Sequence, residues 1–339
     1  MSLRALICSS LSSLCVLLGA TTSLSSLSFD FETSMGPRVD RVNWTIGCPW
    51  VDTLSELTWK HMRILELDLR AHLGLTQNWS LEAIAAGGLI FSGIGRDCDY
   101  LQDGRQMEFS HSSASVHGCV TDLSLCAWRC YPYFQPADSP PARCRFSIGY
   151  GLSAHAQLMC DFNCFQESRG YFVEDGEEVH IDGSVDFKRI HELMEKGCPY
   201  VQESMHSPFC YDIAAIYLAT WTSFFSGARL EIALPPNCWL EGELQFHTGL
   251  YTGAGDWLLR EDISDFVHLA PMMGGVIEGR FGYKLSEGTS LLVGVTARLF
   301  RSEDGKAYVY NYEEYLGESY FNRARWSSVA ATLGLRHLF

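Results

Sequence analysis

The stretch ILELDLRAHLGL, residues 64–75, alternates two kinds of side chain. One series is apolar and the other ionisable: Leu65, Leu67, Leu69, Ala71 and Leu73 against Glu66, Asp68, Arg70 and His72. A period of two residues predicts a β-strand with one apolar and one polar face. In a soluble sandwich the leucines would face a core, whereas in a membrane barrel they would face lipid and the charges would line the interior. This strand alone leaves both interpretations open.

The C-terminal stretch WSSVAATLGLRHLF, residues 326–339, repeats the alternation and ends in the aromatic Phe339. Residues 239–250 and 291–299 show the same pattern. An exported chain that ends in an amphipathic strand with a terminal phenylalanine resembles the outer-membrane barrels of bacteria. The resemblance favours the membrane interpretation and places the chain in the outer membrane.

The links between strands support this choice. Short links alternate with longer polar ones at 98–113, 166–210, 256–265 and 302–320, which is the layout of a transmembrane barrel. We therefore predict an all-β fold, a ten-stranded antiparallel transmembrane β-barrel, with strands at about 27–45, 55–73, 80–97, 114–132, 143–165, 211–234, 237–255, 266–284, 290–301 and 321–339.

Two segments deviate from simple alternation. Residues 184–196 carry helical spacing, which predicts a short helix in the longest outer loop. Residues 213–225 are apolar on both faces, so a buried helix is an alternative to a strand there.

Composition excludes several classes of protein. The chain has 339 residues, of which 47% are hydrophobic and 19% charged, with a net charge of −15. It is too apolar for a disordered protein, and an acidic chain without a basic patch has no nucleic-acid partner. Arg4 followed by an apolar core up to Ala20 predicts a signal peptide over residues 1–26. Residues 27–339 would then form the barrel with its extended extracellular loops.

The chain contains 13 cysteines. Loss of Cys8 and Cys15 with the signal leaves eleven, and in an exported chain they suggest disulfides. Because the number is odd, at least one thiol must stay free or bridge to another molecule. The alternative of a zinc site finds only Cys126-x3-Cys130 and Cys160-x3-Cys164 without a paired Cys/His knuckle, so we expect no metal and no cofactor.

The segment RDCDY, residues 96–100, places two carboxylates one residue apart after the apolar run AIAAGGLIFSGIG. On a strand, Asp97 and Asp99 would point to one side and Cys98 to the other. Calcium binding by these aspartates with Asp103 is one interpretation, but the later bidentate glutamate of a calcium loop is missing.

The order of these features resembles the omptins, ten-stranded outer-membrane aspartyl endopeptidases. The resemblance rests on SELTWK (55–60), the run into Asp97-Cys98-Asp99-Tyr100, EFSHSSAS (108–115) and LQFHTGLYTGAG (244–255). In omptins an Asp-x-Asp pair and an Asp-x-His pair face each other across a groove at the outer rim, and a water held between aspartate and histidine attacks the peptide.

The resemblance implies roles for individual residues. Asp97 and Asp99 would be catalytic, His111 would be the loop histidine, and Asp40 would help to bind a basic substrate side chain. On the second wall the Asp-x-His positions fall on Glu261 and Ile263, so Glu261 is a candidate substrate-binding residue and His268 the nearest candidate base.

Three functions follow as alternatives. The departure on the second wall and the cysteines predict a disulfide-rich envelope or surface component with a degenerate or altered protease site, similar to cysteine-rich outer-membrane proteins of chlamydia-like bacteria. An active endopeptidase that cleaves at basic residues and a small pore are the other two. The expected partners are outer-membrane lipid, with lipopolysaccharide as a candidate, and disulfide-linked envelope proteins.

Overall fold

A computed structural model of the chain describes residues 27–48, 51–131, 143–180, 187–208, 212–234, 236–258, 265–311 and 314–339, most of them in β-strands. The predicted signal peptide at 1–26 lies outside the described residues. The elements are β1 Ser28–Cys48, β2 Val51–Gly74, β3 Trp79–Gln102, η2 Asp103–Arg105, β4 Gln106–Cys130, β5 Arg143–Glu174, β6 Glu177–His180, α2 Phe187–Glu195, β7 Tyr200–Pro208, β8 Ile213–Leu234, β9 Cys238–Asp256, β10 Asp265–Lys284, β11 Thr289–Asn311 and β12 Glu314–Leu338.

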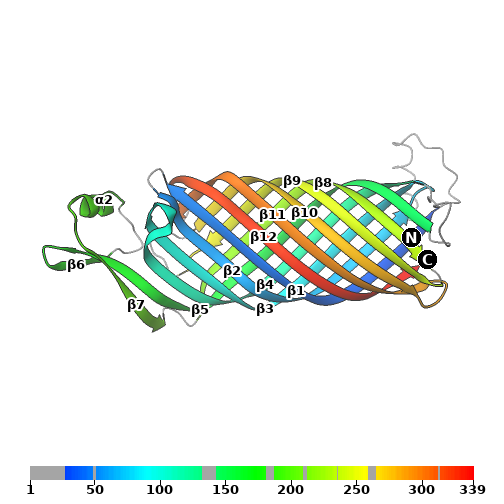
Figure 1. Cartoon of the computed structure of the whole chain (residues 1–339), viewed down its shortest axis with the longest axis horizontal. Helices are drawn as coiled ribbons and strands as arrows, with labels where there is room; N and C mark the ends of the chain where they lie inside the picture. The colour runs from blue at the N-terminus through cyan, green and yellow to red at the C-terminus, as the bar shows by residue number, and fades with distance from the viewer. Residues whose placement is uncertain are drawn as a thin grey trace.

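Ten long antiparallel strands close into a barrel (Figure 1). The strand order is β4-β3-β2-β1-β12-β11-β10-β9-β8-β5, and pairing between β4 and β5 completes the ring. At the seam of the chain ends, β1 pairs with β12 from Asp30↔Leu338 to Gly47↔Tyr320. The short strands β6 and β7 pair only with β5, beyond the ring. The predicted ten-stranded barrel is confirmed.

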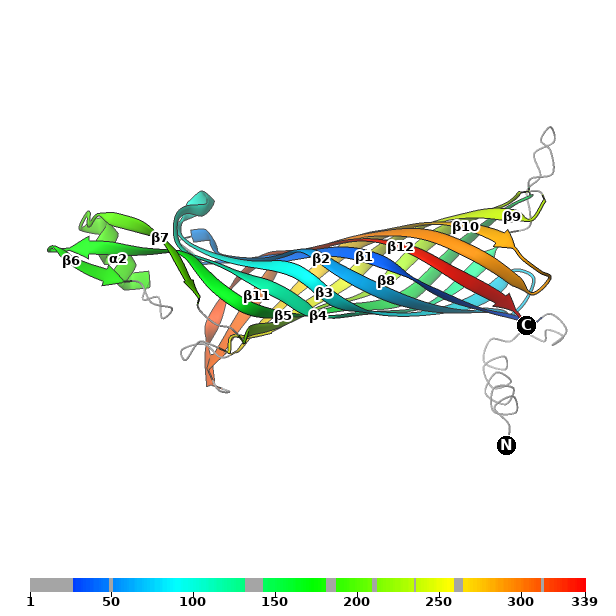
Figure 2. The same cartoon turned by 90° about the horizontal axis from the view of Figure 1, so that it is seen from below.

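Strand β1 begins and strand β12 ends at one end of the barrel, and β6, α2 and β7 project from the other (Figures 1 and 2). A band of exposed apolar side chains surrounds the wall, including Leu65, Leu89 and Phe224, the last two 69% exposed. Toward the projecting end the outward side chains become polar, as at Arg41, Arg63 and Arg325. The band therefore marks the part of the wall that faces lipid, and the projecting end is extracellular.

The predicted helix in the longest outer loop is confirmed as α2. Residues 213–225 belong to strand β8, so the alternative of a buried helix is wrong. One face of β8 packs into the lumen through Trp221, which is fully buried, and the other presents Phe224 to lipid. This explains why both of its faces are apolar. Among the described residues, no helix has the length and apolar character needed to cross a membrane.

The predicted outer loops are shorter than expected because the strands continue through them. β11 and β12 run to Asn311 and from Glu314, so most of 302–320 is hairpin. Likewise β3 and β4 leave only the three residues of η2 between them. Above the membrane both faces of these strands meet polar surroundings, so the alternation that predicts a strand disappears from the sequence.

Ion pairs fill the middle of the lumen and its part opposite the extracellular end. In the middle, Arg38 contacts Asp40, Glu66 and Asp122 at 2.5–2.7 Å. Nearer the chain termini a second network joins three arginines to five glutamates: Arg70, Arg229 and Arg280 with Glu32, Glu82, Glu241, Glu243 and Glu278. Buried charges persist only where each has such partners.

On the extracellular side of the ion pairs, a layer of aromatic side chains crosses the lumen. Its buried rings come from opposite walls and contact one another: Trp44, Trp59, Tyr217, Trp221, Tyr251, Phe266, Phe300, Phe321 and Trp326. Aromatic and charged side chains therefore fill the described interior, as in other narrow barrels.

Candidate functional site

Asp97 and Asp99 lie on the lumen side of the wall at the extracellular end of β3. Asp97 pairs in register with the buried Leu57, and Asp99 with the buried Ser55. The Ser55 hydroxyl is 3.5 Å from Asp97 Oδ1. Cys98, between them, pairs with Glu56 and His111 on the outer face. The structure thus gives the two aspartates the common orientation that the sequence predicts.

Asp40 occupies the barrel interior and not the rim. Its carboxylate accepts hydrogen bonds from Arg38 at 2.6 and 2.7 Å and from Trp326 Nε1 at 3.0 Å. Since the group is 1% exposed and these partners occupy both of its oxygens, the structure gives it a role within the lumen network and no opening toward a substrate.

His268 is enclosed by the aromatic layer. Its ring lies 4.8 Å from that of Trp44 and 4.5 Å from that of Phe321, and Nδ1 is 3.0 Å from the hydroxyl of Tyr217. Only 1% of the residue is exposed. Trp59 stacks on Tyr217, the hydrogen-bond partner of this histidine, and donates to Asp161 at 2.9 Å. His268 is therefore a packed residue of the lumen.

The structure does not bring the other predicted site residues, His111 and Asp103, together with Asp97 and Asp99. Glu261 lies outside the described residues. His111 lies on the outer face with Cys98, opposite to the side that Asp97 and Asp99 face. Asp103, the third aspartate of the calcium interpretation, accepts from the backbone of Asp52 at 2.7 Å and so holds the β1–β2 tip. Within the described part of the chain, the three aspartates form no group of potential metal ligands.

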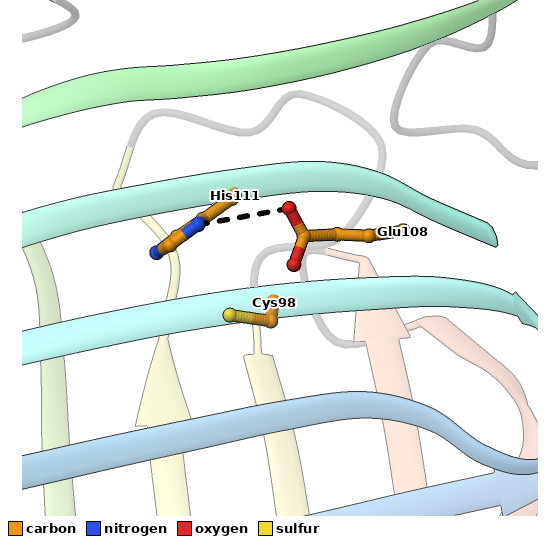
Figure 3. Close-up of side chains that lie close together, drawn as sticks. All are labelled: Cys98, Glu108 and His111. Carbon is orange, nitrogen blue, oxygen red and sulfur yellow. Dashed lines mark ion pairs between the residues drawn. The ribbon is translucent and has the colours of Figure 1, made fainter. Parts of the chain in front are cut away.

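The outer face of β3 and β4 brings together a group that the sequence did not predict. The Cys98 thiol, the Glu108 carboxylate and the His111 imidazole converge from neighbouring strands (Figure 3), with their ligand atoms within 4.8 Å of one another. His111 Nδ1 is 3.6 Å from Glu108, and Nε2 is 3.5 Å from Glu167 on β5. Ser113 donates to Glu167 at 2.5 Å and fixes that second carboxylate.

A bulge produces this convergence. Cys98 pairs directly with His111, but between Asp99 and Tyr100 the register shifts, so Tyr100 meets Glu108 and Phe109 is the extra residue. The shift brings Glu108 close to His111 on the same strand. The only sequence signal is an acidic residue three positions before a histidine, which many solvated loops also show.

Charge and burial both act on the Cys98 thiol, which lies near the extracellular end of β3. Burial, together with the nearby carboxylates of Asp97 and Glu108, raises the pKa of Cys98 to about 12. The thiol is therefore protonated near neutral pH, and it is a poor nucleophile in the absence of a cation.

Most of the described cysteines form no disulfide within the chain. Eight thiols are free of any such bond: Cys98, Cys119, Cys126, Cys130, Cys144, Cys160, Cys198 and Cys238. The expectation of disulfides within the chain is wrong for these eight. Their strand positions hold them apart, because neighbouring cysteines such as Cys119 and Cys160 are offset in register.

Comparison with known proteins supports the fold. The family model described as Pom, Protochlamydia outer membrane protein, matches residues 32–339. The outer membrane protease OmpT from Escherichia coli, an omptin, superposes with a TM-score of 0.61 at 12% identity over 94% of this chain and 99% of that one. The outer membrane protein OprG from Pseudomonas aeruginosa gives a TM-score of 0.31 at 10% identity over 93% and 97%. A search of the curated proteins finds no match.

Proposed function

This chain belongs to the family of Protochlamydia outer membrane proteins, and from that premise we propose that it is a closed, non-enzymatic structural barrel that cross-links to envelope proteins through disulfides. Its location in the outer membrane and its omptin-like barrel are established by the family and the fold. The proposal concerns what the barrel does there.

The observation that carries the proposal is a set of free thiols at the periplasmic rim. Cys130 is the last residue of β4, Cys144 the second residue of β5, and Cys238 the first residue of β9. All three lie at the end where β1 begins and β12 ends, and all three are half-buried free thiols. Exported proteins meet an oxidising compartment, so such thiols are suited to bonds with other proteins.

The chemistry is a thiol–disulfide exchange. A rim thiolate attacks a disulfide of a periplasmic oxidant, and the mixed disulfide is then attacked by a thiolate of the partner protein. One bond joins the barrel to the partner, and the reduced oxidant leaves with two electrons and the thiol protons.

Electrophoresis of isolated envelopes without reductant tests the proposal. We expect high-mass species that reductant converts to monomer. The triple variant Cys130→Ser, Cys144→Ser, Cys238→Ser should lose them, and the control Cys119→Ser, Cys160→Ser, on the outer wall, should retain them. A wild-type chain that runs only as monomer would contradict the proposal.

Because of the aspartate pair, an endopeptidase is the second candidate function. Asp97 and Asp99 face the lumen side as they would on a protease wall, but the described histidines lie elsewhere: His268 is packed among aromatic rings and His111 is on the outer face. Refolded barrel incubated with dibasic peptides should leave them intact. Cleavage that Asp97→Ala abolishes would favour the enzyme instead.

An arginine patch on the outer wall supports anionic membrane lipid as a partner. Arg41, Arg301, Arg323 and Arg325 border a cavity of about 560 Å³, whose lower edge is formed by apolar side chains of the lipid-facing band, Phe246, Met273 and Leu299. Burial and repulsion from Arg325 and Arg105 lower the pKa of Arg323, so an anion would relieve the crowding of positive charge. Lipid phosphates lie at this height, where the apolar band ends.

A further inference from the structure

The outer face of β3 and β4 offers three different metal-ligating atoms in one place. A thiol, an imidazole and a carboxylate are contributed by Cys98, His111 and Glu108, and all three side chains are half-buried. The centre of a triangle with sides of 4.8 Å lies about 2.8 Å from each corner, and zinc–ligand bonds are about 2.0–2.3 Å. Each ligand therefore needs to move inward by about 0.5–0.8 Å, which side-chain rotation can supply.

The surroundings of His111 fit a ligating imidazole. Nδ1 lies on the side of Glu108, and Nε2 points to Glu167, 3.5 Å away. Nε2 is buried and makes no hydrogen bond at that distance. With Nδ1 on a metal, the Nε2 proton would be directed at a carboxylate that Ser113 already holds, which is the usual support for a metal-bound histidine.

The charge of the site also favours a cation. Glu108 and Glu167 lie on either side of His111, and Asp97 and Asp99 lie next to Cys98 in the chain. A divalent ion would balance the carboxylates and bind Cys98 as a thiolate, with release of the thiol proton to solvent.

We propose that Cys98, Glu108 and His111 bind a divalent transition-metal ion of the zinc class, with an open fourth position for water. The mixed sulfur, nitrogen and oxygen set suits zinc and its cobalt substitute better than calcium or magnesium, which prefer oxygen alone. The site does not depend on the proposed cross-linking function, because Cys98 is distant from the periplasmic rim.

The position of the site gives the ion a structural consequence. The Glu108 carboxylate accepts from Ser168 of β5 at 3.0 Å and from Gln202 of β7 at 3.2 Å, and its backbone carbonyl accepts from Tyr200 at 2.5 Å. An ion on Glu108 would thus connect the barrel wall to the base of the projecting β5–β6–α2–β7 unit. Binding should order that unit relative to the barrel.

Titration of the refolded, reduced full barrel with Co²⁺ tests the proposal, because cobalt bound to a thiolate gives a charge-transfer band in the near ultraviolet. We expect a band that saturates at one equivalent and disappears on addition of Zn²⁺. Cys98→Ser should abolish the band, and His111→Ala and Glu108→Gln should each weaken cobalt binding by about tenfold or more. Cys119→Ser, also half-buried on β4, is the matched control and should bind as the wild type does.

A second measurement guards against misfolded variants. Each protein should first show the electrophoretic mobility shift between heated and unheated samples that folded barrels give. In folded wild type, Zn²⁺ should slow alkylation of Cys98 by a maleimide at least tenfold, and His111→Ala should remove this protection. A cobalt band that persists in Cys98→Ser, or unprotected Cys98 in Zn²⁺-saturated wild type, would overturn the proposal.

Discussion

Cys98 shows how neighbouring carboxylates on two strands control one thiol. Because burial and the carboxylates of Asp97 and Glu108 raise its pKa to about 12, the thiolate fraction at neutral pH is very small. We expect alkylation in the presence of a chelator to be far slower than for glutathione and to rise about tenfold per pH unit without a plateau below pH 10. Mass spectrometry of maleimide adducts gives the rate.

Glu108→Gln is the companion variant for this measurement. It removes one of the charges that oppose the thiolate, so the pKa of Cys98 should fall and alkylation at pH 8 should become several times faster. A wild-type rate that levels off near pH 8 or 9 would show that the carboxylates do not control this thiol.

Arg38 is the residue on which the middle lumen network depends. Its guanidinium contacts Asp40, Glu66 and Asp122, so Arg38→Met leaves three buried carboxylates without their main cation. We expect a loss of about 3–5 kcal/mol in the free energy of unfolding. Urea unfolding in lipid vesicles measures the change. Arg63→Met, at an exposed position on the outer wall, is the control and should cost less than about 1 kcal/mol.

At the scale of single residues, the sequence predicts which face of a strand a side chain points to better than it predicts which residues that side chain contacts. Alternation along β3 was enough to place Asp97 and Asp99 on one face and Cys98 on the other. The partners of these residues come from another strand, and the bulge at Asp99/Tyr100 decides which of them is reached. A register shift leaves no mark in one sequence, so the group of Cys98, Glu108 and His111 could not be predicted.

Among the elements, the projecting unit depends on a small apolar cluster of its own. Ile190 and Leu193 of α2 pack with Phe172 of β5, and with Leu101 and Phe109 at the tip of β3 and β4. We expect Leu193→Ala to cost about 2–5 kcal/mol locally, since it leaves a cavity in a cluster with few other contacts. Limited proteolysis should then cut the unit much faster, while the barrel keeps its mobility shift on heating.

Glu192→Ala is the control for this element. Glu192 lies on the exposed side of α2, and its carboxylate is 3.6 Å from Arg189, so its loss should leave the proteolysis rate nearly unchanged. Equal cleavage of Leu193→Ala and wild type would show that the apolar cluster does not hold α2 in place.

The arginine patch is formed by three strands, β1, β11 and β12. Arg301 and Arg325 are direct cross-strand partners, so without an anion their charges repel. We expect vesicles that contain anionic phospholipid to raise the melting temperature over zwitterionic vesicles. The variant Arg301→Ser, Arg325→Ser should lose this difference, and high salt should reduce it in wild type.

Arg145→Ser, at the periplasmic end of β5, is the control for the lipid measurement. It changes the charge without touching the patch and should preserve the lipid-dependent rise. If the rise is the same in the double variant as in wild type, the patch does not bind lipid phosphate.

Over the whole molecule, the number of strands and their order could be predicted because lipid on one side and a polar lumen on the other impose a period of two along each strand. The extent of the strands could not, since above the membrane that constraint ends. The packing of the interior could be predicted only in part from the sequence. Alternation identified Glu66 and Arg70 as residues of a polar face, but the aromatic layer forms only when rings from opposite walls meet.

The two layers that fill the lumen determine whether the barrel conducts ions. The networks around Arg38 and Arg229 occupy the middle and periplasmic parts of the lumen, and the rings around Trp221 and Trp326 occupy its extracellular part. An ion would have to displace both layers, and a cavity of about 270 Å³ at the periplasmic mouth lies below them. We therefore expect no conductance steps in planar bilayers, in contrast to the notion of a small pore.

The layers also predict the behaviour of a variant. Trp221→Ala with Trp326→Ala opens the upper layer but leaves the ion pairs beneath it, so this barrel too should stay closed while becoming less stable by several kcal/mol. Conductance in both proteins would mean that the lumen opens in the membrane. Conductance in the variant alone would identify the aromatic layer as the barrier and the ion-pair layer as permeable, because wild type and variant share every charged residue.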